Sequence, residues 1–147
     1  MSTLSGYKDR TFELPLKVDV YRNLRNGSMS VRARSGKHSG RVVAHMESVI
    51  VKDAQFRVRE NGWRDVHDTG TKNVHAVIRG NMVGSGEVNR DNEPIAAMYN
   101  PKEYRYFVTL DEKPLESAEV VRVTSEPKIM VWNHEEKEDA VPYAESH

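Results

Sequence analysis

Apolar and polar side chains alternate one by one along much of this chain, and no segment carries an apolar stripe at helical spacing. In residues 16–21, Leu16, Val18 and Val20 alternate with charged or polar neighbours, and residues 54–59 follow the same pattern. A period of two places the apolar groups on one face of a β-strand. Turn-forming residues separate short segments of this kind. The sequence therefore predicts a mainly β fold, an antiparallel sheet of short strands with one or two short helices and loose termini.

Turn signals set the expected boundaries. Asn26 and Gly27 suit a tight hairpin, and residues 35–40 have turn chemistry at both ends. Residues 61–70 predict one short helical turn that ends at Gly70. The expected strands cover residues 16–21, 28–33, 41–46, 49–51, 54–59, 72–80, 95–99, 104–110, 118–124 and 129–132.

The length fits a single domain. A chain of 147 residues is too short for two ordinary domains, which need roughly 200 residues or more. We expect a flexible N-terminus at residues 1–14, one β-rich domain at residues 15–132 and an acidic flexible tail at residues 133–147. Residues 81–94 are rich in glycine, asparagine and acids, and we expect a long loop of the kind that often carries binding residues.

The charge is balanced overall but not along the chain. Lysine plus arginine and aspartate plus glutamate each number 22, which excludes a strongly basic DNA-coating protein and an acidic disordered chaperone. Residues 1–80 nevertheless carry 15 basic and 8 acidic side chains, whereas residues 81–147 carry 7 and 14. Either the two halves offset each other within one fold, or the basic half presents a face that favours anionic ligands.

Cysteine is absent, which excludes a disulfide scaffold, a cysteine zinc site and a thiol nucleophile. No apolar run approaches the roughly 18 residues that a membrane helix needs, and residues 1–13 lack the apolar stretch of a signal peptide. We therefore expect a soluble, cytoplasmic protein.

Histidines are the first candidates for chemistry. No histidine pair has the spacing of a metal site, so we expect structural or surface histidines and no metal. His45 and His75 are both expected on strands with their side chains away from the core, where two imidazoles could cleave a phosphodiester by acid–base catalysis. Neither is followed by the H-x-[ST] pattern of two-histidine phosphoesterases. Nucleophile-elbow and phosphate-loop motifs are also missing, which leaves an enzyme as the minority interpretation.

Binding without catalysis fits the residue types better. A guanidinium can grip phosphate with two hydrogen bonds, and a nucleotide base can stack on tyrosine. In residues 99–107 aromatic side chains flank Arg105, although Tyr104 and Tyr106 could equally be surface partners and Asn100 part of a simple turn. The arginines at strand positions are Arg22, Arg32, Arg34, Arg41, Arg57, Arg59, Arg79, Arg105 and Arg122.

Several short segments together resemble a family of small phage and prophage proteins, at or near the first type of Thoeris anti-defence proteins. The resemblance spans roughly residues 16–125. Its segments are residues 21–24, 30–32, 41–45, 72–76 with Arg79 and Gly80, and 99–101 with Tyr104, Phe107 and Val108. Proteins of that type act as sponges that sequester a cyclic ADP-ribose-like signal made by TIR-domain enzymes, and some also hold cyclic oligonucleotides.

The resemblance implies a β-rich protomer that assembles into dimers or larger oligomers, with ligand pockets where protomers meet. It implies that Asn100 and the neighbouring aromatic residues contact adenine and ribose, and that strand arginines meet phosphates. No cofactor is implied. The candidate ligand-binding residues are Tyr99, Asn100, Tyr104, Arg105, Arg122, Arg32, Arg64, Arg79 and His75.

Three hypotheses follow. The first is a non-catalytic sponge that holds a small nucleotide-derived signal without cutting it. The second is a nucleic-acid-binding host-takeover protein that uses the basic first half of the chain. The third is a histidine-dependent ribonuclease or phosphodiesterase.

Overall fold

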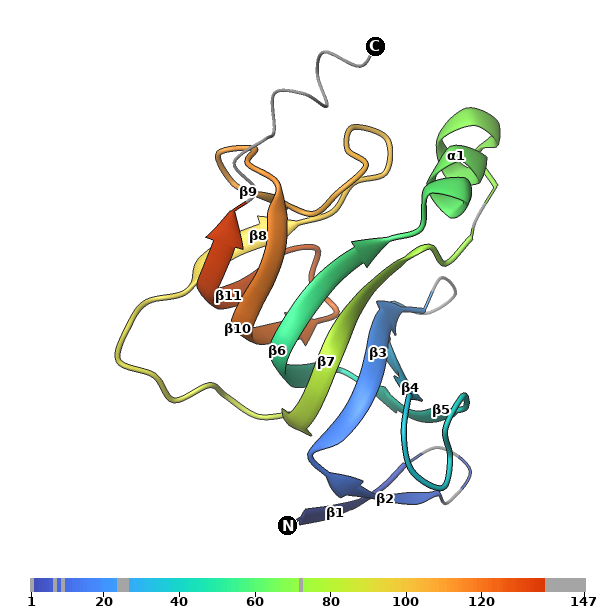
Figure 1. Ribbon diagram of the computed structural model, residues 1–147, viewed down its shortest axis with the longest axis vertical. Helices are drawn as coiled ribbons and strands as arrows, with labels where there is room; N and C mark the ends of the chain where they lie inside the picture. Colours follow the sequence, from blue (N-terminus) through green and yellow to red (C-terminus); the bar gives the residue numbers. More distant parts are fainter. Residues whose placement is uncertain (1, 7, 9, 24–26, 72, 137–147) are drawn as a thin grey trace.

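The computed structural model describes residues 2–6, 8, 10–23, 27–71 and 73–136 of the chain (Figure 1). Its main body is a nine-stranded antiparallel sheet in the order β5-β4-β3-β7-β6-β10-β11-β8-β9, and β1 pairs with β2 in a small separate sheet. The elements are β1 (Ser2–Ser5), β2 (Thr11–Leu14), β3 (Leu16–Arg22), β4 (Met29–Ala33), β5 (Val42–Met46), β6 (Ser48–Val58), α1 (Glu60–Thr69), β7 (Ala76–Gly84), β8 (Ile95–Met98), β9 (Val108–Thr109), β10 (Leu115–Thr124) and β11 (Ile129–Glu136).

The main sheet curls so that strands far apart in its order face each other. β3 and β10 are separated by β7 and β6, which in a flat sheet would place them about 14 Å apart. Arg22, at the end of β3, nevertheless donates hydrogen bonds of 2.6 Å to the carbonyl of Ser125 and 2.7 Å to that of Glu126. Both acceptors lie between β10 and β11, so this Arg22–turn contact holds the two sides of the sheet together.

Burial in this contact lowers the pKa of the Arg22 guanidinium from its ordinary value, because a cation is less stable away from water. The carbonyl acceptors compensate for the lost hydration with charge-assisted hydrogen bonds.

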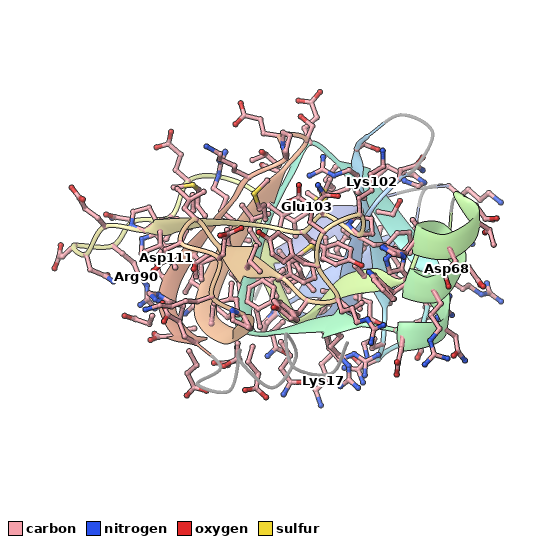
Figure 2. The ribbon with its side chains drawn as sticks, turned by 90° about the horizontal axis from the view of Figure 1, so that it is seen from above. Lys17, Asp68, Arg90, Lys102, Glu103 and Asp111 are labelled. Atoms are coloured by element: carbon pink, nitrogen blue, oxygen red, sulfur yellow. The ribbon has the colours of Figure 1, made fainter. Side chains whose placement is uncertain are left out.

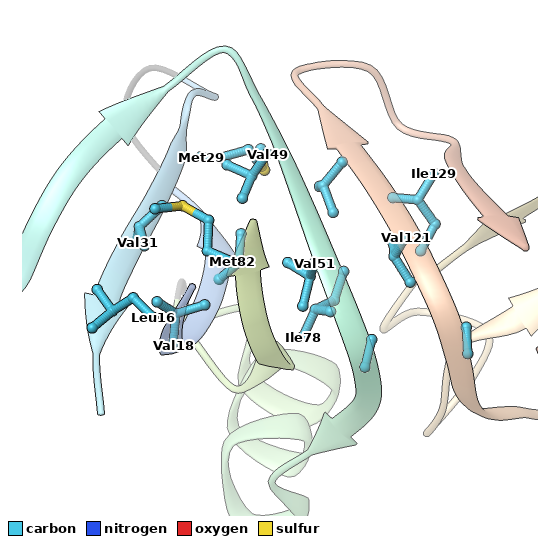
Figure 3. Packing of buried hydrophobic residues seen from close by; sticks show 14 of the residues in the cluster. Leu16, Val18, Met29, Val31, Val49, Val51, Ile78, Met82, Val121 and Ile129 are labelled. Carbon is cyan, nitrogen blue, oxygen red and sulfur yellow. The ribbon is translucent and has the colours of Figure 1, made fainter. Parts of the chain in front are cut away.

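The core fills the inside of the curl. Buried side chains from both sides of the sheet meet there, including Val31, Met82, Val51, Val121 and Ile129 (Figure 3). All five are at most 4% exposed. Full burial of one such side chain contributes about 1.5–3 kcal/mol, so this cluster supplies much of the driving force for the curl.

A bulge in β6 requires a glycine on the neighbouring strand. Asp53 has a φ of 51°, and the register between β6 and β7 shifts between Lys52 and Gln55. At Gly80 on β7, an added Cβ would lie 2.6 Å from both the Lys52 carbonyl oxygen and the Val51 Cγ1. The bulged backbone can therefore approach β7 only where β7 lacks a side chain.

The predicted fold class is confirmed: the protein is mainly β, with one antiparallel sheet of short strands and a single short helix in the described residues. The helix ends as expected, because Gly70 adopts a φ of 72° and donates to the Val66 carbonyl at 3.0 Å. Gly27 also has a positive φ, of 75°, whereas Asn26 of the predicted turn lies outside the described residues.

Several strand boundaries differ from the prediction, and β10 and β11 are each longer than expected. The expected strands 49–51 and 54–59 form one strand, β6, because the bulge at Asp53 bends the strand without ending it. β7 begins at Ala76 and runs to Gly84, four residues into the expected loop. Of the expected strand 104–110, only Val108–Thr109 is a strand.

The shortening of the expected strand 104–110 has a local cause. The Trp63 indole Nε1 donates to the carbonyl oxygens of Pro101 and Tyr104, both at 2.9 Å. The start of the expected strand is therefore held in a turn against α1.

The ends of the chain are partly ordered into strands. β1 and β2 lie within the first 14 residues, and β11 continues past Trp132 to Glu136. The boundaries predicted at residues 14 and 132 stay predictions, and residues 137–147 of the expected tail lie outside the described residues. No helix in the described part of the chain has the length and apolar character needed to cross a membrane.

Replacing Arg22 tests the curl. We expect Arg22→Gln to lower the free energy of unfolding by about 1–2 kcal/mol, because it removes charged hydrogen bonds to the solvent-exposed carbonyls of Ser125 and Glu126. Urea denaturation measures this. Arg64→Gln is the control, since Arg64 forms an exposed pair with Glu60, and pairs of this kind contribute about 0.3–0.5 kcal/mol. Equal effects of the two substitutions would contradict the role of Arg22.

Replacing Gly80 tests the bulge. Gly80→Ala should destabilise the protein by about 1–3 kcal/mol, because the new methyl group overlaps the β6 backbone. Gly84→Ala on the same strand is the matched control, because a Cβ there meets nothing within 4 Å. We expect that control to stay within about 0.5 kcal/mol of the unchanged protein in the same denaturation experiment.

Candidate anion-binding groove

A groove of about 330 Å³ gathers four arginines on the outer face of the sheet. Its other lining residues are one aspartate, one histidine and three valines. We call this site the arginine groove; it is lined by Asp19, Arg32, Arg57, Val58, Arg59, Val74, His75, Val77 and Arg79. Four guanidinium groups against one carboxylate give it a clear excess of positive charge.

Strand pairing brings these residues together from distant parts of the sequence. Asp19 on β3 is the direct partner of Arg32 on β4 and of Arg79 on β7. Arg57 on β6 is paired with Val77 on β7. Because these residues alternate with core-facing ones such as Val18 and Ile78, their side chains share the outer face.

Arg79 and Asp19 form the central ion pair of the groove. The Nε and Nη2 of Arg79 donate to the two carboxylate oxygens of Asp19 at 2.8 and 3.1 Å. This hydrogen bonding raises the pKa of Arg79 above its ordinary value. Asp19 is only 8% exposed, so its carboxylate depends on Arg79 for compensation of its charge.

Arg32 has an unused donor. Its guanidinium lies 5.1 Å from the centre of the Tyr21 ring, at cation–π distance. Its Nε is buried and has no hydrogen-bond partner among the described residues. Buried donors of folded proteins are nearly always paired, so this N–H calls for an acceptor that the described residues do not supply.

The other two arginines of the groove, Arg57 and Arg59, differ in the hydrogen bonds that their side chains make. Arg59 donates to the Val74 carbonyl at 3.2 Å and lies 3.5 Å from the Asn73 Oδ1. The Arg57 side chain is exposed and forms no hydrogen bond or ion pair within the described part of the chain. Arg57 is therefore the arginine most available to an incoming anion, and the Arg32 Nε is a buried donor without an acceptor among the described residues.

His75 also lines the groove, and both of its ring nitrogens have hydrogen-bond partners. Its Nδ1 lies 2.8 Å from the Asn73 carbonyl oxygen, and its Nε2 lies 2.5 Å from the Tyr99 hydroxyl. A carbonyl can only accept, so Nδ1 carries a hydrogen, and in the neutral ring Nε2 accepts from Tyr99. The α1 backbone also rests on this residue, since a Cβ on Gly62 would lie 2.3 Å from the His75 Cβ.

The prediction for His75 is wrong in two respects. His75 precedes β7 instead of lying on a strand, and it is buried instead of facing away from the core. The alternation fails because β7 begins only at Ala76 and α1 covers the residue before it.

His45 is not close to His75. It lies on β5, which β4 and β3 separate from β7, and its Nδ1 is 3.2 Å from the Ser30 Oγ. In the described residues no group of three histidine or acidic side chains is arranged to hold a metal ion.

Three predicted site residues, Arg64 of α1, Tyr104 and Arg105, lie around Trp63 instead of in the arginine groove. We call this group the Trp63 cluster. Arg105 lies 4.2 Å from the Trp63 ring centre and 3.9 Å from Glu60, which also pairs with Arg64 at 2.9 Å. The Tyr104 hydroxyl donates to Glu112, and this bond together with desolvation raises the pKa of Tyr104 to about 12.

Asn100 and Arg122 also lie outside the arginine groove. The Asn100 Oδ1 accepts from the Lys102 backbone N–H at 3.0 Å, the turn that the sequence left open as an alternative. Arg122 on β10 donates to the Gly86 carbonyl at 3.0 Å. Figure 2 shows Lys17, whose strand carries Asp19, well apart from Lys102 and Glu103 of the Asn100 turn.

The structure therefore brings together Arg32, Arg79 and His75, with Tyr99 behind His75, and leaves the other candidates elsewhere. Sequence reasoning did not assign Asp19, Arg57 or Arg59 to the site. Two signals were present: Arg57 and Arg59 alternate with Phe56 and Val58, and Asp19 interrupts an otherwise apolar strand. The strand register that brings these residues together cannot be read from the sequence alone.

Comparison with known protein families gives a match over most of the chain. The profile of the family described as Mycobacterium phage L5 gene 82 protein matches residues 11–131. Neither a curated protein nor a solved structure matches the chain. The matched segment contains all the residues that line the arginine groove. The chain therefore belongs to the phage family of the Mycobacterium phage L5 gene 82 protein.

Proposed function

We propose that this phage-family protein is a non-catalytic binding protein that sequesters a small phosphorylated, nucleotide-derived signal in the arginine groove. The ligand class is the one that the sequence resemblance implies, a cyclic ADP-ribose-like molecule or a cyclic oligonucleotide. The buried Arg32 Nε without an acceptor, in a groove with four arginines and one aspartate, is the observation that carries the proposal.

Phosphate oxygens match the free donors of the groove. A phosphate oxygen placed at the Arg32 Nε would accept a hydrogen bond from a buried N–H. A second phosphate oxygen could accept from the Arg57 guanidinium. Hydrogen bonds to charged groups contribute about 1.5–3 kcal/mol each. Two or three of them, with a base stacked at about 1–3 kcal/mol, approach the roughly −11 kcal/mol of a dissociation constant near 10 nM. Exclusion of water at a protomer interface would add to this, and we propose a dimer or larger oligomer.

The state of the histidines supports binding without cleavage. Both ring nitrogens of His75 are engaged by Asn73 and Tyr99, so neither is free to exchange a proton with a ligand in the groove. His45 is three strand positions away, roughly 14 Å. A two-histidine phosphodiesterase mechanism would need both imidazoles beside the same phosphate.

Nucleic-acid binding is the second candidate, and the open shape of the groove favours it. Its arginines come from β4, β6 and β7 and the residue after β6, so the positive charge extends across neighbouring strands. Consecutive phosphates of a single strand could follow such a row.

A binding and recovery experiment separates these functions. The protein is incubated with cyclic ADP-ribose and with cyclic dinucleotides, washed and heat-denatured, and the released ligand is analysed by chromatography. We expect tight binding and intact ligand. Degraded ligand would establish an enzyme. Salt-sensitive retention of RNA or DNA without small-nucleotide binding would establish the second candidate.

Substitutions locate the ligand. Arg57→Gln should weaken nucleotide binding about 10–100-fold, because it removes a charged donor that has no side-chain partner in the described part of the chain. Calorimetric titration measures the affinity, and Arg64→Gln, an exposed helix residue, is the matched control.

Arg105→Gln tests the alternative position at residues 99–107. Its guanidinium lies over Trp63, so we expect little change in affinity. A larger loss of affinity for Arg105→Gln than for Arg57→Gln would move the site from the arginine groove to the Trp63 cluster.

A further inference from the structure

A second pocket lies inside the curl and is independent of the arginine groove. It has a volume of about 290 Å³ and is lined by residues of β3, β4, β7, β8, β10 and β11, together with Tyr99, Phe107 and Pro127 between strands. Of its twelve lining residues nine are apolar, two are tyrosines and one is Arg22. We call it the inner pocket; its apolar wall includes Val20, Met29, Ile78, Met98, Phe107 and Ile129.

The size and lining define the body of a ligand. At about 30 Å³ for each water, the inner pocket has room for roughly ten non-hydrogen atoms. Two methionines line it, and methionine side chains adapt to the shape of a bound group. The stacked rings of Tyr99 and Phe107, 5.1 Å between centres, form an aromatic wall beside them. A small ring or a short branched chain fits this environment.

Arg22 defines the charge of the ligand. It is the only charged residue among the described residues that line the inner pocket, and none of them is a carboxylate. Its Nη1 and Nη2 donate to the carbonyls of Ser125 and Glu126, with longer contacts of 3.5 Å to the Gly27 carbonyl and 3.4 Å to the Thr124 carbonyl. No described residue accepts from its Nε. A partly buried cation whose Nε has no acceptor and which has no counter-ion among the described residues favours an anion.

We propose that the inner pocket binds a small organic acid, with its apolar body between Met29, Met98 and Phe107 and its carboxylate at Arg22. The proposal does not rest on the nucleotide function, since no residue lines both sites. The two sites do share a connection, because His75 of the groove is hydrogen-bonded to Tyr99 of the inner pocket.

Three probes of nearly equal shape test the proposal: phenylacetate, 2-phenylethanol and 2-phenylethylamine. Each is titrated into the full chain and followed by calorimetry and by amide NMR shifts. We expect phenylacetate to bind at least tenfold more tightly than the alcohol, and the amine to bind most weakly. The shifts should concentrate at residues such as Ala76, Met98 and Val123.

Substitutions in the pocket wall show whether the probes occupy the inner pocket. Ala76→Leu should abolish binding of both acid and alcohol, because the larger side chain occupies the pocket. Arg22→Gln should reduce the acid-to-alcohol affinity ratio to about one, whereas Arg22→Lys, which keeps the charge, should retain a preference for the acid. Folding of each variant is checked by near-UV circular dichroism. If Arg22→Gln does not fold, Arg22→Lys and Ala76→Leu decide the outcome.

Arg57→Gln provides the control for the groove, because it should weaken nucleotide binding and leave phenylacetate binding unchanged. Loss of phenylacetate binding in Arg57→Gln, equal affinities for acid and alcohol, or no binding at millimolar concentration would each overturn the inner-pocket proposal. None of these results bears on nucleotide sequestration, which the recovery experiment tests separately.

Discussion

The hydrogen bonds from Arg22 to the turn between β10 and β11 are the contact on which the shape of this protein depends. A nine-stranded antiparallel sheet has no inherent reason to bring its third and sixth strands together. The apolar core favours a curl in general, but burial is not directional and does not select which ends meet. The guanidinium supplies that direction, because its acceptors are backbone carbonyls whose positions are fixed by the turn.

The same curl gives the two faces of the sheet different chemistry. The inside holds valine, methionine and aromatic side chains, and the outside of β3, β4, β6 and β7 holds arginines around Asp19. Asp19 orients Arg79, whereas the Arg32 Nε and the Arg57 guanidinium have no hydrogen-bond acceptor among the described residues. The four arginines of this outer face all come from the basic first half of the chain, residues 1–80.

Alternation along the chain was enough to predict the fold class and most strands, because the side-chain period of a strand is a local property. It predicted β3, β4 and β5 closely but gave wrong boundaries for β6 and β7, where a bulge and the helix intervene. The candidate site was only partly predictable. Arg32 and Arg79 share a groove because of strand register, and His75 is buried because Gly62 admits the α1 backbone. Both depend on contacts between distant residues, which a single sequence does not encode visibly.

The bulge at Asp53 and the missing side chain at Gly80 constrain each other across two strands. Neither position can change alone without a steric conflict or an unfilled space. Among related phage proteins the two features should therefore be inherited as a unit: a chain that keeps the bulge keeps the glycine, and a chain with a larger residue at that place has a regular β6. In such a chain β6 would lose the residue that the bulge inserts, so every later side chain of the strand would turn to the opposite face of the sheet. Arg57 and Arg59 would then exchange faces with Phe56 and Val58, and the outer face would lose half of its arginines.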